Sequence, residues 1–187
     1  MTVVFLLNLF LISFLLQSTL LHYTAVRGVR PDLILLLACL VGLFFGRQRG
    51  LVLGALAGLL QDCLSGGLFG LNTLSKALVG FTTGVLQHHV GLHHRLLQAL
   101  VVALLSAFDG LLTISLVKLF HGSGPLVQPT VVLLLYQTVY NGLVAIPYFA
   151  VLSRVAWRYL PSGGFAELPA GSPGLRHLLK RTSYRVQ

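Results

Sequence analysis

The stretch Gly50-Leu-Val-Leu-Gly54-Ala-Leu-Ala-Gly58-Leu-Leu-Gln-Asp62 carries a glycine at every fourth position and ends on an acidic residue. On a helix, a step of four residues drifts by about 40°, so these positions form one slowly winding stripe. Small residues let membrane helices approach each other closely. The stripe therefore predicts either tight packing inside a bundle or a groove that accepts a partner helix or a lipid. The same spacing includes Gly42, Gly46, Gly66 and Gly70.

The composition around this stretch is that of a membrane protein. The 187 residues are 56% hydrophobic and only 9% charged, with a mean hydropathy of +0.87. A soluble domain carries about 25% charged residues, so a soluble fold is excluded, as are a disordered chain and a disulfide-rich secreted module. In a soluble protein, the formal charge of +9 would suggest nucleic acid. Here we assign the basic residues to the anionic inner leaflet and expect no nucleic acid partner.

Apolar runs follow one another along the first 160 residues. A spanning helix needs about 20 apolar residues. The first, fifth and sixth runs approach or exceed that length, whereas the three middle runs are short and predict tilted or broken spans. We predict an all-α integral membrane bundle of six spans at residues 3–21, 33–46, 50–64, 74–86, 96–120 and 129–152, with a basic tail at 161–187.

The basic residues divide unevenly between the two sides of such a bundle. Six spans put both termini on one side, and the loops of the opposite side hold only Arg27 and Arg30. The positive-inside rule then predicts that both termini are cytoplasmic. The tail is expected to form either a short amphipathic helix on the inner leaflet or a plain basic extension. The basic residues on the predicted inner side are Arg47, Arg49, Arg95, Arg154, Arg158, Arg176, Lys180, Arg181 and Arg185.

Four polar residues fall within or beside the predicted spans: Asp62, Asn72, Lys76 and Asp109. A carboxylate at the centre of a bilayer costs on the order of 3 kcal/mol, so such a residue suggests a function by default. Asp62 and Lys76 are candidates for an ion pair across the turn between the third and fourth spans. We interpret these residues as fixing the shape of the bundle, with proton or ion coupling as the alternative.

Signatures of catalysis are missing from the sequence. There is no G-x-S-x-G, H-E-x-x-H or phosphate-binding Walker motif. His88, His89, His93 and His94 form a histidine-rich loop without a nearby cysteine or carboxylate, which favours a polar interfacial loop over a metal site. We therefore expect no enzyme activity, no metal and no cofactor.

Several motifs, taken in order, resemble the rod shape-determining protein MreD family. The likeness covers roughly Phe5 to Arg158, and its most distinctive piece is the glycine stripe followed by Asp62 and the next turn. The motifs are Arg30-Pro31-Asp32, then Gly54-x-x-x-Gly58-Leu-Leu-Gln-Asp62 with Ser65-Gly66-x-x-x-Gly70, then Gln98 to Ser106 with Asp109, and Asn141-Gly142-x-x-x-x-Pro147. Carried onto this sequence, the family motif covers Pro31, Gly58, Asp62, Gly66, Gly70, Asp109, Asn141 and Pro147.

This resemblance implies a multi-pass protein of the bacterial inner membrane that belongs to the cell-elongation machinery for peptidoglycan synthesis. It implies MreC as the direct partner, with RodA, a class B penicillin-binding transpeptidase and, indirectly, MreB in the wider complex. It also implies a fold similar to the six-helix substrate-binding subunits of energy-coupling-factor transporters, and no catalytic activity.

Three functions remain open at this point. The first is a non-enzymatic scaffold that binds MreC, in which a bulky residue at Gly54 or Gly58 disrupts assembly or MreC binding. The second is a small-molecule or lipid-binding transport subunit, which predicts a polar pocket near Arg27, Arg30 and Asn72. The third is a membrane enzyme acting on lipid. The candidate residues for partner or bundle packing are Gly50, Gly54, Gly58, Gly66, Gly70, Asn141, Gly142 and Pro147, and membrane lipids are expected to surround the chain.

Overall fold

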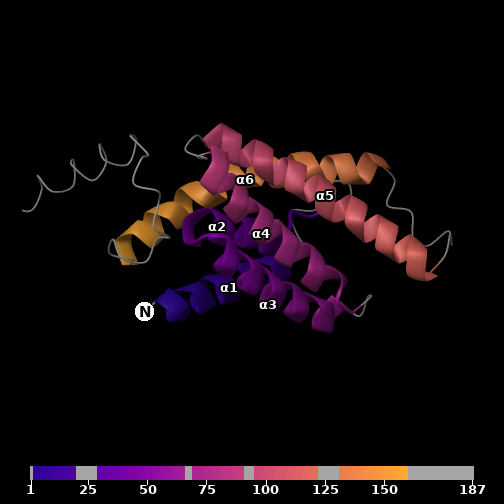
Figure 1. Cartoon of the computed structure of the whole chain (residues 1–187), viewed down its shortest axis with the longest axis horizontal. Helices are drawn as coiled ribbons and strands as arrows, with labels where there is room; N and C mark the ends of the chain where they lie inside the picture. Colours follow the sequence, from indigo (N-terminus) through magenta and orange to yellow (C-terminus); the bar gives the residue numbers. More distant parts are fainter. Residues whose placement is uncertain (1, 20–28, 66–68, 91–94, 122–130, 160–187) are drawn as a thin grey trace, which may run out of the picture.

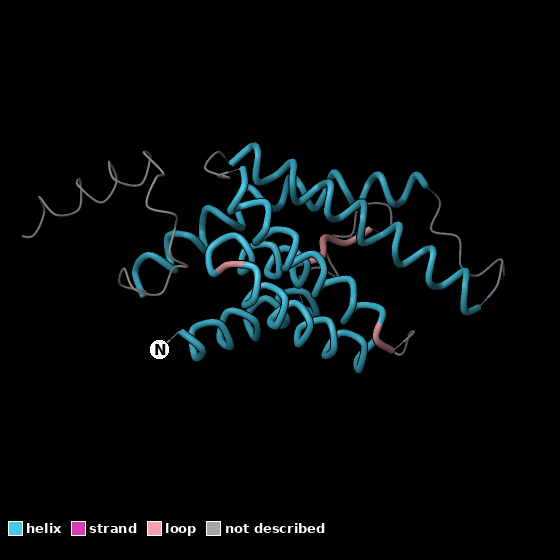
Figure 2. Tube along the Cα trace, in the orientation of Figure 1, coloured by secondary structure: helices cyan, strands magenta, loops and turns pink. Residues whose placement is uncertain are grey.

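The computed structural model describes residues 2–19, 29–65, 69–90, 95–121 and 131–159. These residues form six α-helices and no strand, which confirms the all-α prediction (Figures 1 and 2). The helices are α1 (Thr2–Thr19), α2 (Leu33–Phe45), α3 (Arg47–Ser65), α4 (Leu71–Val90), α5 (Arg95–His121) and α6 (Val131–Tyr159). The predicted tail at 161–187 and Gly66 of the predicted packing set lie outside the described residues.

Helix α2 forms the centre of the bundle. Twelve of its 13 residues are buried, as expected for a helix that is apolar on every side. Asp32 caps its N-terminus, because the Asp32 carboxylate accepts hydrogen bonds from the backbone amides of Ile34 and Leu35, each at 3.0 Å. It ends at Gly46, whose φ of 85° is a conformation that glycine adopts without strain. The chain turns sharply there and continues directly into α3.

The glycine stripe of α3 packs against the backbone of α4. A Cβ atom added to Gly54 would lie 2.2 Å from the carbonyl oxygen of Lys76, and one added to Gly58 would lie 2.2 Å from that of Asn72. A Cβ atom on Gly50 would lie 2.5 Å from a carbonyl oxygen of α4. Of the two interpretations of the stripe, these contacts support close packing within the chain, because α4 already occupies the surface on which a partner helix would have to dock.

Helices α5 and α6 form an antiparallel pair along one side of the bundle, and α1 covers another part of it (Figure 1). Gly142 of α6 faces Ala103 of α5, with 3.2 Å between the Ala103 Cβ atom and a Cβ atom added at Gly142. Pro147 lies inside α6 without ending it. Six residues beyond Gly142, the hydroxyl of Tyr148 lies 2.8 Å from that of Ser13, which joins α6 to α1.

The exterior of the bundle is apolar. Leu11, Leu56, Leu104 and Leu143 on four different helices are each more than half exposed. Charged residues such as Lys76 and Asp109 are buried inside. Helix segments Arg95–Phe120 and Val132–Leu152 are long and apolar enough to cross a membrane, and Val4–Thr19 and Leu33–Phe45 are shorter apolar helices. An apolar exterior around a polar interior is the arrangement that a bilayer favours.

The short second run of the sequence has a structural explanation. A helix of the length of α2 rises about 20 Å, which is less than the roughly 30 Å of a hydrocarbon core. Its N-cap residue Asp32 lies at the level of Asp109, near the middle of α5, because both residues contact the same lysine. Helix α2 therefore begins about halfway along α5.

Candidate functional site

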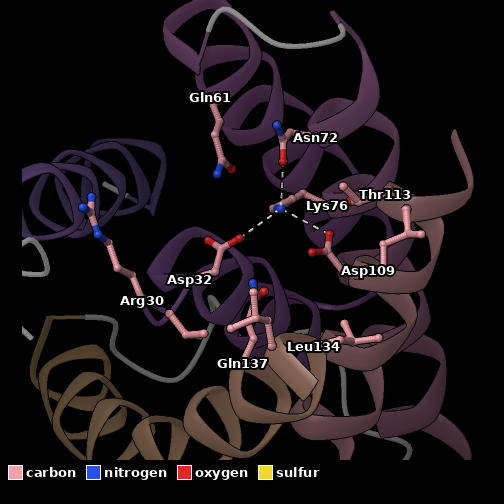
Figure 3. Close-up of a pocket in the computed structure, with 13 residues that line it drawn as sticks. Arg30, Asp32, Gln61, Asn72, Lys76, Asp109, Thr113, Leu134 and Gln137 are labelled. Atoms are coloured by element: carbon pink, nitrogen blue, oxygen red, sulfur yellow. Dashed lines mark hydrogen bonds and ion pairs between the residues drawn. The ribbon is translucent and has the colours of Figure 1, made fainter. Parts of the chain in front are cut away.

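A buried lysine joins three parts of the chain at the N-terminus of α2. The Nζ atom of Lys76 on α4 lies 3.0 Å from Oδ2 of Asp32 and 3.2 Å from Oδ1 of Asp109 on α5. It also donates a hydrogen bond of 3.0 Å to Oδ1 of Asn72, one turn earlier on α4 (Figure 3). Lys76 is only 2% exposed. An ammonium group has three donors, so these three oxygens use all of them.

Neutral side chains extend this network to the α5–α6 pair. The backbone N–H of Asp32 donates to Oδ1 of Asn141 at 2.8 Å, and Nδ2 of Asn141 donates to the hydroxyl of Ser106 at 2.7 Å. The hydroxyl of Ser75 donates to Asp109. Buried polar groups are tolerated in an apolar bundle only when they find such partners. The network thus connects α2, α4, α5 and α6.

Asp62 has a different role from the one that the sequence predicted. Its carboxylate accepts hydrogen bonds from the backbone amides of Gly70, Asn72 and Thr73 at 2.9 to 3.0 Å. It also accepts from Nδ2 of Asn72 and from the hydroxyl of Thr73. The predicted ion pair between Asp62 and Lys76 is therefore wrong, because Asp62 caps the N-terminus of α4, where backbone N–H groups need acceptors and favour a negative charge.

A cavity of about 420 Å³ lies beside the lysine network. Its polar walls come from the segment before α2 and from α3, α4, α5 and α6, and the side chains that Figure 3 shows on opposite sides of it include Gln61 and Gln137. The polar residues that line it are Arg30, Asp32, Gln61, Asn72, Lys76, Asp109, Thr113 and Gln137. Its apolar walls are Val29, Ile114, Leu133 and Leu134, with Gly110 beside them.

One buried acceptor at this cavity has no partner. The Oε1 atom of Gln61 is shielded from solvent and accepts no hydrogen bond. Figure 3 shows its amide directed toward the space beside Asp32 and Lys76. The only other buried side-chain atom without a partner among the described residues is the hydroxyl of Thr138 on α6, which does not line the cavity.

The structure brings together part of the predicted residue set. Asn72, Lys76, Asp109 and Asn141 meet in one network, whereas Asp62 caps α4 next to it. Gly50, Gly54 and Gly58 lie on the α3–α4 interface, Gly142 and Pro147 lie on α6, and Gly70 adopts a φ of 94° in the turn before α4 with nothing within 4 Å of an added Cβ atom.

Sequence reasoning missed Asp32 and Gln61 as members of the site. Asp32 had a usable signal, because an aspartate between a proline and a long apolar run marks a helix N-cap. Gln61 had no such signal, because a single glutamine beside an aspartate is not a recognisable pattern. Its position across the cavity from Gln137 of α6 follows only from how the helices pack. Across the described parts of the chain, no three His, Cys, Asp or Glu side chains gather as a metal site would require. His93 and His94 lie outside the described residues.

Comparison with known proteins assigns the family. The family model described as rod shape-determining protein MreD matches residues 1–155. No curated protein and no solved structure matches the chain. The family match covers most of the 187 residues and includes all the helices that form the lysine network up to Val155 of α6. The chain therefore belongs to the rod shape-determining protein MreD family.

Proposed function

We propose that this chain is a non-enzymatic scaffold of the bacterial cell-elongation complex, which it serves by binding MreC within the inner membrane. Membership of a family of membrane proteins for rod-shape determination is the observation that carries this proposal. In the proposed complex, RodA and a class B penicillin-binding transpeptidase assemble through MreC, and MreB is reached indirectly. The scaffold regulates peptidoglycan synthesis by positioning its partners in the membrane, and it requires no catalytic group of its own.

The interior of the bundle supports a role that depends on a fixed shape. Lys76, Asp32 and Asp109 link three helices by ion pairs, and Asp62 fixes the α3–α4 turn. Such contacts favour one arrangement of the helices over alternative arrangements. The exposed apolar faces outside this framework are then the surfaces available to the MreC span and to lipid.

The test is a detergent pull-down of the tagged full chain from its native membrane, with mass spectrometry of the proteins recovered. We expect MreC, with RodA and the transpeptidase behind it. Docking is located with four matched substitutions, Leu11→Ala, Leu56→Ala, Leu104→Ala and Leu143→Ala. Each of these leucines is more than half exposed, so each variant should keep the stability of the bundle. Only the variant on the docking face should lose MreC binding. Absence of MreC from every pull-down would contradict the proposal.

The cavity favours a second candidate function, a small-molecule or lipid-binding subunit for transport. A polar pocket near Arg30 and Asn72 is what that function requires, and both residues line the cavity. The proposed similarity to substrate-binding subunits of energy-coupling-factor transporters points in the same direction, although a fold alone is weak support for a function. Recovery of an ATPase pair with a coupling subunit, in place of MreC, would favour this candidate.

The proposed topology places the cavity toward the outside of the cell. The cavity is lined by the residues before α2, the end of α3, the start of α4 and the first turns of α6. These parts adjoin the α1–α2, α3–α4 and α5–α6 connections, which all lie on one side of an up-and-down bundle. With both termini in the cytoplasm, that side faces the periplasm.

A further inference from the structure

The buried side-chain atom that is left unpaired in the described walls of the cavity is an acceptor. Lys76 is the buried cation of its walls, and its three donors are already used by Asp32, Asp109 and Asn72. An anion could reach the ammonium only by displacing one of these oxygens. The Oε1 atom of Gln61, in contrast, is buried and accepts nothing. A ligand that donates hydrogen bonds would satisfy this wall, whereas one that only accepts would not.

The buried charges next to the cavity do not balance. Two carboxylates, those of Asp32 and Asp109, share the single ammonium of Lys76, and all three side chains are at most 8% exposed. A surplus negative charge in an apolar surrounding is costly unless a cation compensates it. The other cation that lines the cavity is Arg30, which is exposed and whose guanidinium points away from Lys76 in Figure 3.

The size and the walls of the cavity suit an organic molecule. A volume of about 420 Å³ falls in the range of about 300–1,000 Å³ that is usual for small-molecule pockets. Ile114, Leu133 and Leu134 give it an apolar wall on the α5–α6 side. A divalent metal ion prefers several carboxylate ligands at short distance, and one of the two carboxylates here is already shared with Ser75 and Lys76.

We propose that the cavity binds the ammonium group of a zwitterionic organic molecule, with the ammonium against Asp32, Asp109 and Gln61 and the anionic group toward Arg30. The ammonium supplies the positive charge and the donors that the inner wall lacks. Arg30 at the edge repels a simple cation but attracts a molecule that also carries a negative group. Both a phospholipid headgroup of the ethanolamine type and a free zwitterion of that size have this chemistry.

This inference names the ligand class for the binding function proposed for the cavity, and it does not depend on MreC. The full-length chain, purified in detergent, is examined by native mass spectrometry with phosphatidylethanolamine, phosphatidylglycerol, phosphoethanolamine and ethanolamine as probes. We expect phosphatidylethanolamine to be retained at least tenfold more tightly than phosphatidylglycerol, which has no ammonium group. Competition by phosphoethanolamine would show that the headgroup is sufficient, and its absence would identify the lipid as the source.

Two matched substitutions test the contact with Gln61. Gln61→Leu removes the unpaired acceptor at nearly constant size, and Thr138→Val removes the other unpaired buried oxygen, which lies away from the cavity. Because neither oxygen has a partner, neither change should lower the thermal midpoint. Gln61→Leu should weaken phosphatidylethanolamine binding about tenfold, as the loss of one charge-assisted hydrogen bond predicts, and Thr138→Val should leave it unchanged.

A third substitution separates the two ends of the ligand. Arg30→Gln removes the exposed cation from the edge of the cavity, so it should weaken phosphoethanolamine several-fold while leaving ethanolamine binding unchanged or stronger. The inference is overturned if no probe forms an adduct, if phosphatidylglycerol binds as tightly as phosphatidylethanolamine, or if Gln61→Leu and Thr138→Val behave alike. If the chain recovers MreC but binds no probe, the scaffold proposal still holds and only this inference fails.

Discussion

The ammonium of Lys76 lies 3.0 Å from the carboxylate of Asp32, inside a bundle whose exterior is apolar. The two residues are separated by the whole of α2 and α3, so their contact fixes where the N-terminus of α2 sits against α4. Asp32 also caps α2 through the amides of Ile34 and Leu35. One carboxylate therefore begins the central helix and attaches it to the neighbouring one.

Replacing the lysine should destabilise the whole bundle. Lys76→Met keeps much of the side-chain volume but leaves Asp32 and Asp109 as two buried carboxylates without a cation. Removing one partner of a buried ion pair costs about 3–5 kcal/mol, so we expect the free energy of unfolding to fall by that amount. Denaturant unfolding of the purified chain in detergent micelles measures the loss.

The matched control for that loss is Lys118→Met, because Lys118 is an exposed lysine on α5. It should change the free energy of unfolding by no more than about 0.5 kcal/mol. Adding Asp109→Asn to Lys76→Met removes one of the stranded charges and should restore part of the stability. Equal effects of the two lysine substitutions, or no recovery in the double variant, would show that the ion pairs do not hold the helices together.

Asp62 should control the local stability of the α3–α4 turn. Asp62→Ala removes an acceptor that serves the amides of Gly70, Asn72 and Thr73. The loss of a charged cap is expected to cost about 2–3 kcal/mol. Where exchange proceeds by local opening, hydrogen exchange at these three amides should accelerate by roughly 30-fold or more.

Asp62→Asn is the graded control, since it keeps one oxygen acceptor and loses the charge. Its exchange rates should lie between those of the wild type and Asp62→Ala, and the amide of Val144, distant on α6, should change little in either variant. If protection is lost equally in α6, Asp62 supports the global fold and not this turn.

The α3–α4 contact should tolerate no added methyl group at Gly54. Gly54→Ala would place its Cβ atom 2.2 Å from a backbone oxygen, whereas Gly110→Ala would meet only the end of the Leu134 side chain, which can rotate away. Overpacking typically costs about 1–3 kcal/mol, and we expect Gly54→Ala at or above the top of that range and Gly110→Ala near the bottom. Thermal unfolding in detergent compares the two.

The same comparison addresses partner binding. If Gly54→Ala lost MreC while its thermal midpoint stayed at the wild-type value, the stripe would be a docking surface and the packing interpretation would fail. We expect Gly54→Ala to lose both MreC binding and thermal stability.

The approximate positions of the helices follow the apolar runs and their breaks, although α3, α4 and α6 extend past the predicted runs 50–64, 74–86 and 129–152. The predicted run 96–120 corresponds to α5 (Arg95–His121), and Gly46 ends α2 where the apolar pattern is interrupted. The glycine stripe also predicted a helix face of small residues, because a four-residue spacing keeps them together, but it left packing within the bundle and a groove for a partner or lipid both open. These features are local, and local sequence is enough to determine them.

The partners of Lys76 could not be predicted in the same way. Asp62 is nearest to Lys76 along the chain among the acids, but its carboxylate is occupied by the first turn of α4. Lys76 lies one turn further along and points into the bundle toward Asp32 and Asp109. Which acid meets a lysine depends on how three helices pack, and no spacing within one helix contains that information. For the same reason, the sequence predicted a polar pocket near Arg30 and Asn72 but did not predict the walls of the cavity on α3, α5 and α6.

The proposed orientation in the membrane can be tested at the two ends of α2. Arg30 and Arg47 flank this helix, both are exposed, and the topology with cytoplasmic termini puts them on opposite sides. Single cysteines at these positions are introduced in a Cys63→Ser background, since Cys63 is exposed and Cys39 is buried. A membrane-impermeant maleimide applied to intact spheroplasts should label Arg30→Cys, and should label Arg47→Cys only after permeabilisation. The reverse pattern would invert the topology, and with it the side from which the cavity is reached.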